Sequence, residues 1–133
     1  MKPPLSGDDI VRVIALTRDA DGWHALHSIA ESEKWMLLWA HTAERAKELI
    51  ARYRAGVVIC DRDLPNEDWR RVVSELGAIR PAVCTLLASH VADEYLWREL
   101  VQQGGFEILA KPFARDRVAR AIRFAASFGT AHA

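Results

Sequence analysis

The sequence predicts an α/β domain: a single doubly wound, five-stranded parallel sheet with helices on both faces. Five short apolar runs alternate with five amphipathic stretches along the 133 residues, and the connections between them are short. Successive parallel strands need crossover connections, which place helices on both sides of the sheet. In addition, the apolar run Val57–Cys60 leads directly into Asp61. The chain is long enough for one domain with a core and too short for two.

Each expected strand is an apolar run without polar alternation, which is typical of a buried parallel strand. Pro65 follows the third run, and because proline cannot continue the hydrogen-bond ladder, the chain leaves the sheet there. The five runs are Ile10–Leu16, Trp35–Ala40, Val57–Cys60, Ala82–Ala88 and Phe106–Ala110.

Between these runs, apolar residues recur at helical spacing. The first helix is expected to start near Asp21, Thr42 can cap the second helix, and Gly104-Gly105 end the fourth. The apolar faces are Trp23, Leu26, Ile29 and Ala30; Ala43, Ala46, Ile50 and Tyr53; Trp69, Val72, Val73 and Leu76; Leu96 and Leu100 with Trp97 and Val101 beside them; and Val118, Ala121, Ile122, Ala125 and Phe128. One domain is expected over residues 1–133, with its core at about 10–128 and a frayed tail at Gly129–Ala133.

Composition gives little support to nucleic-acid binding or to a polybasic membrane surface. The 18 Lys and Arg residues balance the 18 Asp and Glu residues, so the formal net charge is zero. Cys60 and Cys84 lie inside apolar runs without metal-ligand spacing, which indicates small buried side chains in a reducing compartment. The start of the chain lacks the apolar core of a signal peptide, and no run is long enough to span a bilayer. We therefore expect a cytoplasmic protein.

Polar side chains follow three of the expected strands where those strands end. Asp61, Ser89 and Lys111 stand at the carboxyl ends of the third, fourth and fifth strands. In open α/β sheets that edge is where ligands bind, although aspartate also ends strands simply as a turn residue. The set suits an aspartyl phosphate, in which Asp61 is the nucleophile. Lys111 would pair with the phosphate and Ser89 would donate a hydrogen bond to it.

On these residues the chain resembles the receiver domain of bacterial two-component response regulators. The matching pieces are Asp61-x-x-Leu64-Pro65, Ser89, and the run from Gly104-Gly105 to Lys111-Pro112-Phe113. The resemblance implies a flavodoxin-like fold with strand order 2-1-3-4-5, and a cis peptide bond at Lys111-Pro112.

The resemblance also implies a function. A sensor histidine kinase or phosphotransfer protein would transfer a phosphoryl group to Asp61, with Mg²⁺ required. The domain would then signal to an output protein through its fourth helix, fifth strand and fifth helix. Any enzymatic activity would be limited to self-phosphorylation and dephosphorylation at Asp61. The domain could stand alone, because no output domain follows the fifth helix.

The first strand shows the main departure from the family. Thr17-Arg18 occupy the places of two adjacent acidic residues that help to hold Mg²⁺, and this metal prefers oxygen ligands. The remaining candidate ligands are Asp61, the main chain of Asp63 and, weakly, Asp19. Asp19 and Asp21 could ligate if the loop bends inward, although capping is the favoured reading. Mg²⁺ binding is therefore expected to be weak or absent, and the Arg18 guanidinium could replace the charge of the metal beside Asp61.

Two further departures keep an alternative function open. Trp69 stands where the family usually has glycine, and Ile108 stands where it has the switch aromatic. Phe106 is expected on the same face of the strand as Ile108, but it is not assigned the switch role. The alternative is a phosphorylation-independent pseudo-receiver, an interaction module in which Arg18 keeps Asp61 paired. A flavodoxin-like enzyme or nucleotide binder is disfavoured, because no glycine-rich phosphate loop follows the first strand.

The surface of the fourth and fifth helices suggests a weak homodimer. Trp97 falls where an exposed ring could anchor a partner. The fifth helix carries four arginines and the neighbouring elements carry acids, which form either a solvated face or a self-complementary twofold interface. These residues are Arg115, Arg117, Arg120 and Arg123, with Asp93, Glu94, Glu99 and Glu107. The histidines His24, His27, His41, His90 and His132 show no convincing metal-ligand spacing.

Overall fold

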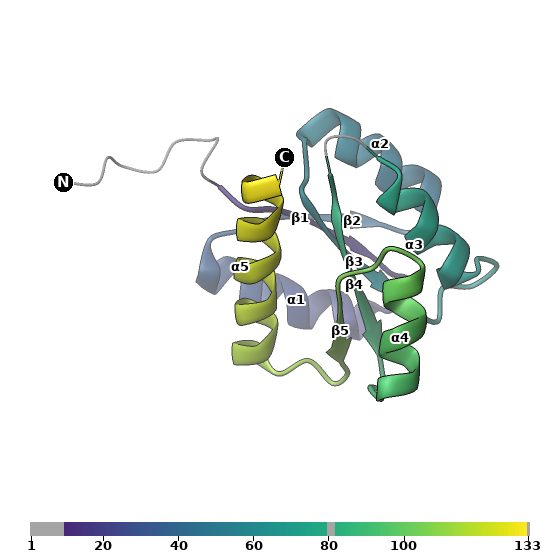
Figure 1. Cartoon of the computed structure of the whole chain (residues 1–133). Helices are drawn as coiled ribbons and strands as arrows, with labels where there is room; N and C mark the ends of the chain where they lie inside the picture. The colour runs from purple at the N-terminus through teal and green to yellow at the C-terminus, as the bar shows by residue number, and fades with distance from the viewer. Residues whose placement is uncertain (1–9, 80–81, 133) are drawn as a thin grey trace.

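The computed structural model describes residues 10–79 and 82–132, in which five strands form one parallel sheet (Figure 1). The strand order is β2-β1-β3-β4-β5, as expected. The strands are β1 (Arg12–Leu16), β2 (Met36–Ala40), β3 (Val57–Asp61), β4 (Cys84–Ser89) and β5 (Glu107–Ala110). Helices cover both faces of this sheet, which confirms the doubly wound α/β architecture.

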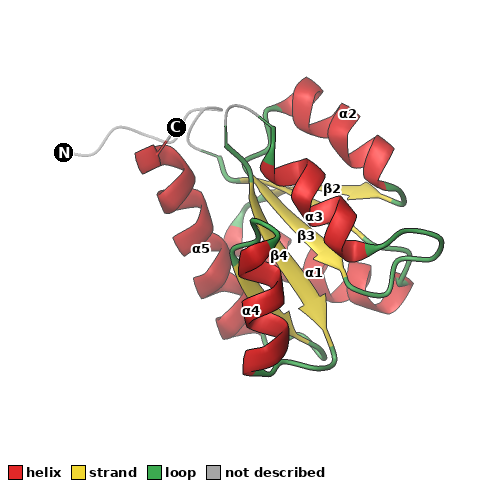
Figure 2. Ribbon diagram, turned by 45° about the vertical axis from the view of Figure 1, so that its right-hand side comes forward, coloured by secondary structure: helices red, strands yellow, loops and turns green. Residues whose placement is uncertain are grey.

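Two groups of helices sandwich the sheet (Figure 2). Helices α1 (Ala20–Glu33) and α5 (Arg115–His132) lie on one face, and α2 (Ala43–Tyr53), α3 (Trp69–Gly77) and α4 (Glu94–Gln102) lie on the other. Because successive side chains of a strand point to opposite faces, each central strand supplies both cores. In β3, Val57 and Ile59 pack toward α1 and α5, whereas Val58 and Cys60 pack toward the other three helices.

Polar side chains cap the starts of helices α1 to α4. Thr42 accepts a hydrogen bond at the start of α2 as expected, and Asp19, Asp68 and Asp93 do the same for α1, α3 and α4. The element boundaries differ slightly from expectation, since β1 and β5 begin at Arg12 and Glu107. Helix α5 continues to His132, past the expected tail boundary at Phe128.

Several other expectations are met. Both cysteines are buried and free, and burial raises the pKa of each thiol. The Lys111-Pro112 peptide bond is cis. Within the described residues, none of the helices has the length and apolar character needed to cross a membrane.

Candidate functional site

Asp61 is the last residue of β3, and its carboxylate is enclosed by donors. Oδ2 accepts hydrogen bonds from Lys111 Nζ at 3.0 Å and from Thr17 Oγ1 at 2.9 Å. Oδ1 accepts one from the backbone N–H of Asp63 at 3.1 Å. Only 7% of the Asp61 side chain is exposed, and a buried charge is tolerated when it is paired and hydrogen-bonded in this way.

Lys111 supplies the positive charge of the site from the loop after β5. Its backbone N–H donates to the carbonyl of Ser89 at 2.9 Å, which ties it to the end of β4. Its side chain is 8% exposed, and Nζ also lies 3.4 Å from Asp19 Oδ2. The ammonium group therefore sits between two carboxylates, and the predicted meeting of Asp61 and Lys111 is confirmed.

Thr17 is a partner of Asp61 that the sequence did not reveal as such. In the ladder Leu16 pairs with Cys60, so Thr17 and Asp61 are the next residues along their strands. Thr17 Oγ1 accepts a hydrogen bond from the backbone N–H of Asp19 at 3.0 Å and donates its own proton to Asp61. A hydroxyl directly after a buried strand, beside the strand that ends in Asp61, was the signal that could have found it.

Asp19 caps α1, in agreement with the favoured reading. Oδ1 accepts from the backbone N–H of Asp21 at 3.1 Å. A backbone hydrogen bond from Gly22 and the nearby Lys111 together lower the pKa of Asp19, against the opposing effect of burial. Asp19 therefore joins the site as a second carboxylate on Lys111.

Arg18 does not take the expected position. Its side chain is exposed and makes no contact with Asp61, so the expectation that its guanidinium would lie beside Asp61 is wrong. Residues alternate in direction along an extended chain. Thr17 points into the site, and its neighbour points out.

Ser89 lies at the same sheet edge, as the last residue of β4. The side chain is buried, and Oγ accepts a hydrogen bond from the backbone N–H of Val91 at 3.1 Å. Among the described residues it makes no hydrogen bond to Asp61. Asp63 contributes its N–H to Asp61, and its side chain is exposed.

The protein leaves little space beside Asp61 on the side of α1 and α5. A cavity of about 10 Å³ lies there, lined by Thr17, Gly22, Leu26, Ile59, Asp61, Ala88, Lys111 and Phe113. A volume of this order holds about one water molecule. A tetrahedral anion bound to Asp61 would therefore lie outside this cavity.

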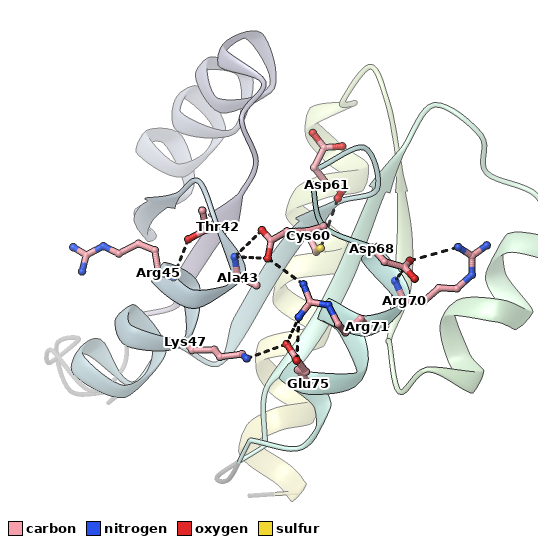
Figure 3. Close-up of polar contacts among 11 residues, drawn as sticks. Thr42, Ala43, Arg45, Lys47, Cys60, Asp61, Asp68, Arg70, Arg71 and Glu75 are labelled. Atoms are coloured by element: carbon pink, nitrogen blue, oxygen red, sulfur yellow. Dashed lines mark hydrogen bonds and ion pairs between the residues drawn. The ribbon is translucent and has the colours of Figure 1, made fainter. Parts of the chain in front are cut away.

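The loop from Asp61 to α3 is fixed by a charged network between α2 and α3 (Figure 3). Glu67 accepts from the backbone N–H of Ala43 at 3.0 Å, at the start of α2, and pairs with Arg71 at 3.4 Å. Arg71 and Lys47 each lie 2.9 Å from Glu75. The carboxylate of Asp61 is turned away from this network, which holds the loop without competing for the site.

Helix α3 is further tied to its neighbours by its first two residues, Trp69 and Arg70. Trp69, at the position where glycine is usual in the resembled family, is buried in the core. Arg70 pairs with Glu99 of α4 and lies over the Trp69 ring, 4.8 Å from its centroid. The large side chain therefore anchors the start of the helix.

A comparison with protein families shows to which family the chain belongs. The model of the response regulator receiver domain matches residues 11–123. The chain belongs to this family. It is therefore a receiver domain of two-component signalling.

Known proteins agree with this assignment. The receiver domain is 31% identical over 69 residues to the C4-dicarboxylate transport transcriptional regulatory protein DctD of Rhizobium meliloti (strain 1021); the match covers 52% of the chain and 15% of DctD. A putative response regulator from Chloroflexus aurantiacus J-10-fl superposes with a TM-score of 0.80 at 17% identity, over 89% of this chain and 98% of that one. A CheY-like receiver domain protein from Methanospirillum hungatei JF-1 gives 0.81 at 15% identity, over 93% and 99%.

Receiver domains generally bind Mg²⁺ for phosphorylation, but the residues of this receiver domain do not fit that metal. Mg²⁺ requires several oxygen ligands in octahedral geometry. Asp61 and Asp19 are the carboxylates that meet here, and Lys111 already lies between them. Nowhere in residues 10–79 and 82–132 do three His, Cys, Asp or Glu side chains gather into a possible metal site.

The region of the usual switch aromatic also differs. Ile108 is partly buried and packs against the core under α2, α3 and α4. Phe106 lies on the opposite side, where its ring is 5.6 Å from that of Phe124 in α5, so the expectation of a shared face was wrong. The strand begins only at Glu107, and the alternation does not extend back to Phe106.

Proposed function

We propose that this receiver domain accepts a phosphoryl group on Asp61. The observation that supports the proposal best is the buried contact of 3.0 Å between Asp61 Oδ2 and Lys111 Nζ. A fixed ammonium group beside the attacking carboxylate stabilises the negative charge of the phosphoryl group during its transfer. Ser89 is part of this proposal as a donor to the phosphate, because its hydroxyl accepts from the Val91 N–H and keeps its own proton for a phosphate oxygen.

The hydrogen bonds favour Oδ1 as the attacking atom. Oδ2 already accepts from two side chains, whereas Oδ1 accepts from a single backbone N–H. Oδ1 would attack phosphorus and form the new P–O bond. The bond from phosphorus to the donor breaks, and its electron pair leaves with the donor: a histidine nitrogen in a kinase, or a carboxylate in a small acyl phosphate. No proton has to leave Asp61, because it reacts as a carboxylate.

A second candidate is an interaction module that works without phosphorylation. It is favoured by the contacts of Asp61, because Thr17, Asp63 and Lys111 already donate to its carboxylate. The aliphatic Ile108, in the place of the usual switch aromatic, also favours this candidate. In this candidate Thr17 and Lys111 keep Asp61 paired, in place of Arg18.

Intact mass after incubation with a small acyl phosphate separates the two candidates. With Mg²⁺ present in the buffer, the wild type is expected to gain one phosphate mass. The Asp61→Asn variant, which preserves size and removes the nucleophile, is expected to gain none. Asp63→Asn, at the exposed neighbouring carboxylate, is the matched control and should be modified like the wild type. No uptake by the wild type, even with a cognate kinase, would favour the interaction module.

We propose the surface of α4, β5 and α5 as the docking site for an output partner. A groove of about 560 Å³ along β5 and α5 is lined by Phe106, Ile108, Leu109, Arg117, Arg120 and Phe124, among others. Arg115, Arg117 and Arg120 have no acidic partner within the described part of the chain. Glu94 and Glu99 of α4 already pair with Arg98 and Arg70. Two arginines and one acid, Glu107, line the groove, so its net charge is positive and an acidic partner with apolar side chains fits it better than a second copy.

Two parts of this function go beyond family membership. The phosphodonor is proposed to be a sensor histidine kinase or a phosphotransfer protein, because these supply two-component receivers. A cytoplasmic location is proposed because Cys60 and Cys84 are free and buried, which suits a reducing compartment. Since the chain spans 15% of the length of DctD, the activity of any larger protein is not transferred to it.

A further inference from the structure

The backbone of Thr17 is held by a tryptophan at the edge of the sheet. The indole N–H of Trp39, in β2, donates to the carbonyl of Thr17 at 2.9 Å. The N–H of Thr17 donates to the carbonyl of Ala40 at 3.0 Å. Both backbone groups of Thr17 are therefore fixed by the end of β2, one through a side chain.

The hydroxyl of Thr17 has a fixed direction for the same reason. Oγ1 accepts from the backbone N–H of Asp19 at 3.0 Å, so its proton is free to point at Asp61 Oδ2, which lies 2.9 Å away. A hydroxyl has one proton, and in this arrangement that proton is committed to Asp61. The backbone position of Thr17 therefore determines how Oδ2 is held.

The ring of Trp39 is itself restrained. It stacks on Trp23 of α1 with centroids 4.6 Å apart and planes 8° apart, and the ring of His41 meets it edge-on at 4.9 Å. Stacked and edge-on ring pairs both stabilise a particular ring orientation. The indole N–H is thus presented to Thr17 by a packed aromatic cluster.

We propose that Trp39 is a positioning residue for Asp61, acting through Thr17. The expected effect on phosphorylation rests on the proposed function. The hydrogen-bond chain from Trp39 through Thr17 to Asp61 does not depend on that function. The indole N–H fixes the Thr17 carbonyl, Thr17 holds Oδ2, and Oδ1 remains the oxygen that reacts. Loss of the indole donor loosens Thr17 and lets the carboxylate rotate away from its reactive orientation.

Phosphate uptake in a double-mutant cycle tests the inference. Trp39→Phe keeps an aromatic ring and removes the donor, and it should slow uptake from a small acyl phosphate about threefold to tenfold, the effect of one net hydrogen bond. Trp35→Phe is the matched control, because Trp35 directly precedes β2 and Trp39 lies near the other end of that strand. Uptake by this variant should stay within about twofold of the wild type. In a Thr17→Ala background, Trp39→Phe should slow uptake no further. Independent, multiplying effects of the two substitutions would overturn the inference.

A spectroscopic measurement keeps this inference separate from the proposed function. In the ¹H–¹⁵N spectrum, Asp61→Asn should shift the indole N–H signal of Trp39, while that of Trp35 stays in place. If the wild type takes up no phosphate, the proposed function fails, and this shift still decides whether Trp39 and Asp61 are linked. An unmoved Trp39 signal would overturn the positioning role. Thermal unfolding of each variant establishes that it is folded.

Discussion

At the residue scale, the Asp61 carboxylate is held by donors from three separate segments of the chain, at Thr17, Asp63 and Lys111. An aspartate after a buried apolar run, with a lysine after the last run, was enough to place Asp61 and Lys111 together. The sequence does not determine which neighbour turns inward, because that depends on side-chain direction at the end of β1. Thr17-Arg18 were therefore interpreted as two lost metal ligands, and the Arg18 guanidinium was expected beside Asp61, where the Thr17 hydroxyl lies.

One of the two missing acidic residues can be supplied to test the interpretation that the site does not fit Mg²⁺. Thr17→Asp adds a third carboxylate beside Asp61 and Asp19, and Mg²⁺ affinity should rise about tenfold or more, equivalent to roughly 1.4 kcal/mol. Thr17→Asn is the control of similar size without the charge, and it should bind Mg²⁺ as weakly as the wild type. Tryptophan fluorescence during a Mg²⁺ titration measures this. Tight saturation of the wild type would show that the existing carboxylates do form a metal site.

Asp19 should make the stability of the fold depend on acid. Its pKa is lowered in the folded protein by the backbone N–H of Gly22 and by Lys111. The carboxylate therefore contributes stability above the unfolded pKa of about 4, and this contribution is lost as the pH falls through the folded value. Asp19→Asn keeps the cap and removes the charge.

Urea unfolding at pH 7 and at pH 3 measures the effect. The wild type should be more stable than Asp19→Asn at pH 7, by a small amount because 40% of the side chain is exposed, and the difference should shrink at pH 3. A difference that is the same at both pH values would show that the charge of Asp19 does not contribute.

At the scale of the elements, apolar runs predicted the strands, and apolar residues at helical spacing, with cap residues, predicted the helices. Together they gave the order and type of every strand and helix. The ends were less certain, since they depend on hydrogen bonds between strands. Phe106 shows the consequence: it was counted as a strand residue, and its place in the alternation was wrong. In the structure its ring packs against Phe124 and Phe128 of α5 instead.

The connection from α4 to β5 depends on a glycine. A Cβ atom at Gly105 would lie 2.1 Å from Leu100 Cδ1 and 2.5 Å from Leu100 Cγ, and Leu100 is fully buried. Gly105→Ala should therefore lower the free energy of unfolding by about 1–3 kcal/mol, through overpacking. Gly56→Ala is the matched control, because no atom lies within 4 Å of a Cβ there. Urea unfolding midpoints compare them, and equal midpoints would contradict the packing argument.

At the scale of the whole molecule, assembly depends on how strongly two copies attract one another. Trp97 is 43% exposed, and burial of such a ring contributes on the order of 2 kcal/mol if it is a hot spot. Each exposed charge pair adds only about 0.2–1 kcal/mol. With Glu94 and Glu99 already paired within the chain, we expect at most a weak, salt-sensitive dimer.

Sedimentation across a salt series tests this expectation. The wild type should show weak association at low salt, and Trp97→Ala should reduce it. Arg45→Ala, an exposed arginine on α2, should leave it unchanged. A monomer at every salt concentration, or a dimer indifferent to both salt and Trp97, would rule out this interface.

The separation of the site residues along the chain has a consequence for synthesis on the ribosome. Asp61 and Lys111 are 50 positions apart, and Asp19 and Lys111 are 92 apart. A nascent chain that has made β1 and β3 but not β5 holds a carboxylate at the sheet edge without its ammonium partner. Proper enclosure of Asp61 has to wait until the last strand has emerged and docked. The ion pair between Asp61 and Lys111 therefore stabilises only a chain that includes Lys111. A chain that ends before Lys111 leaves the Asp61 carboxylate without its ammonium partner.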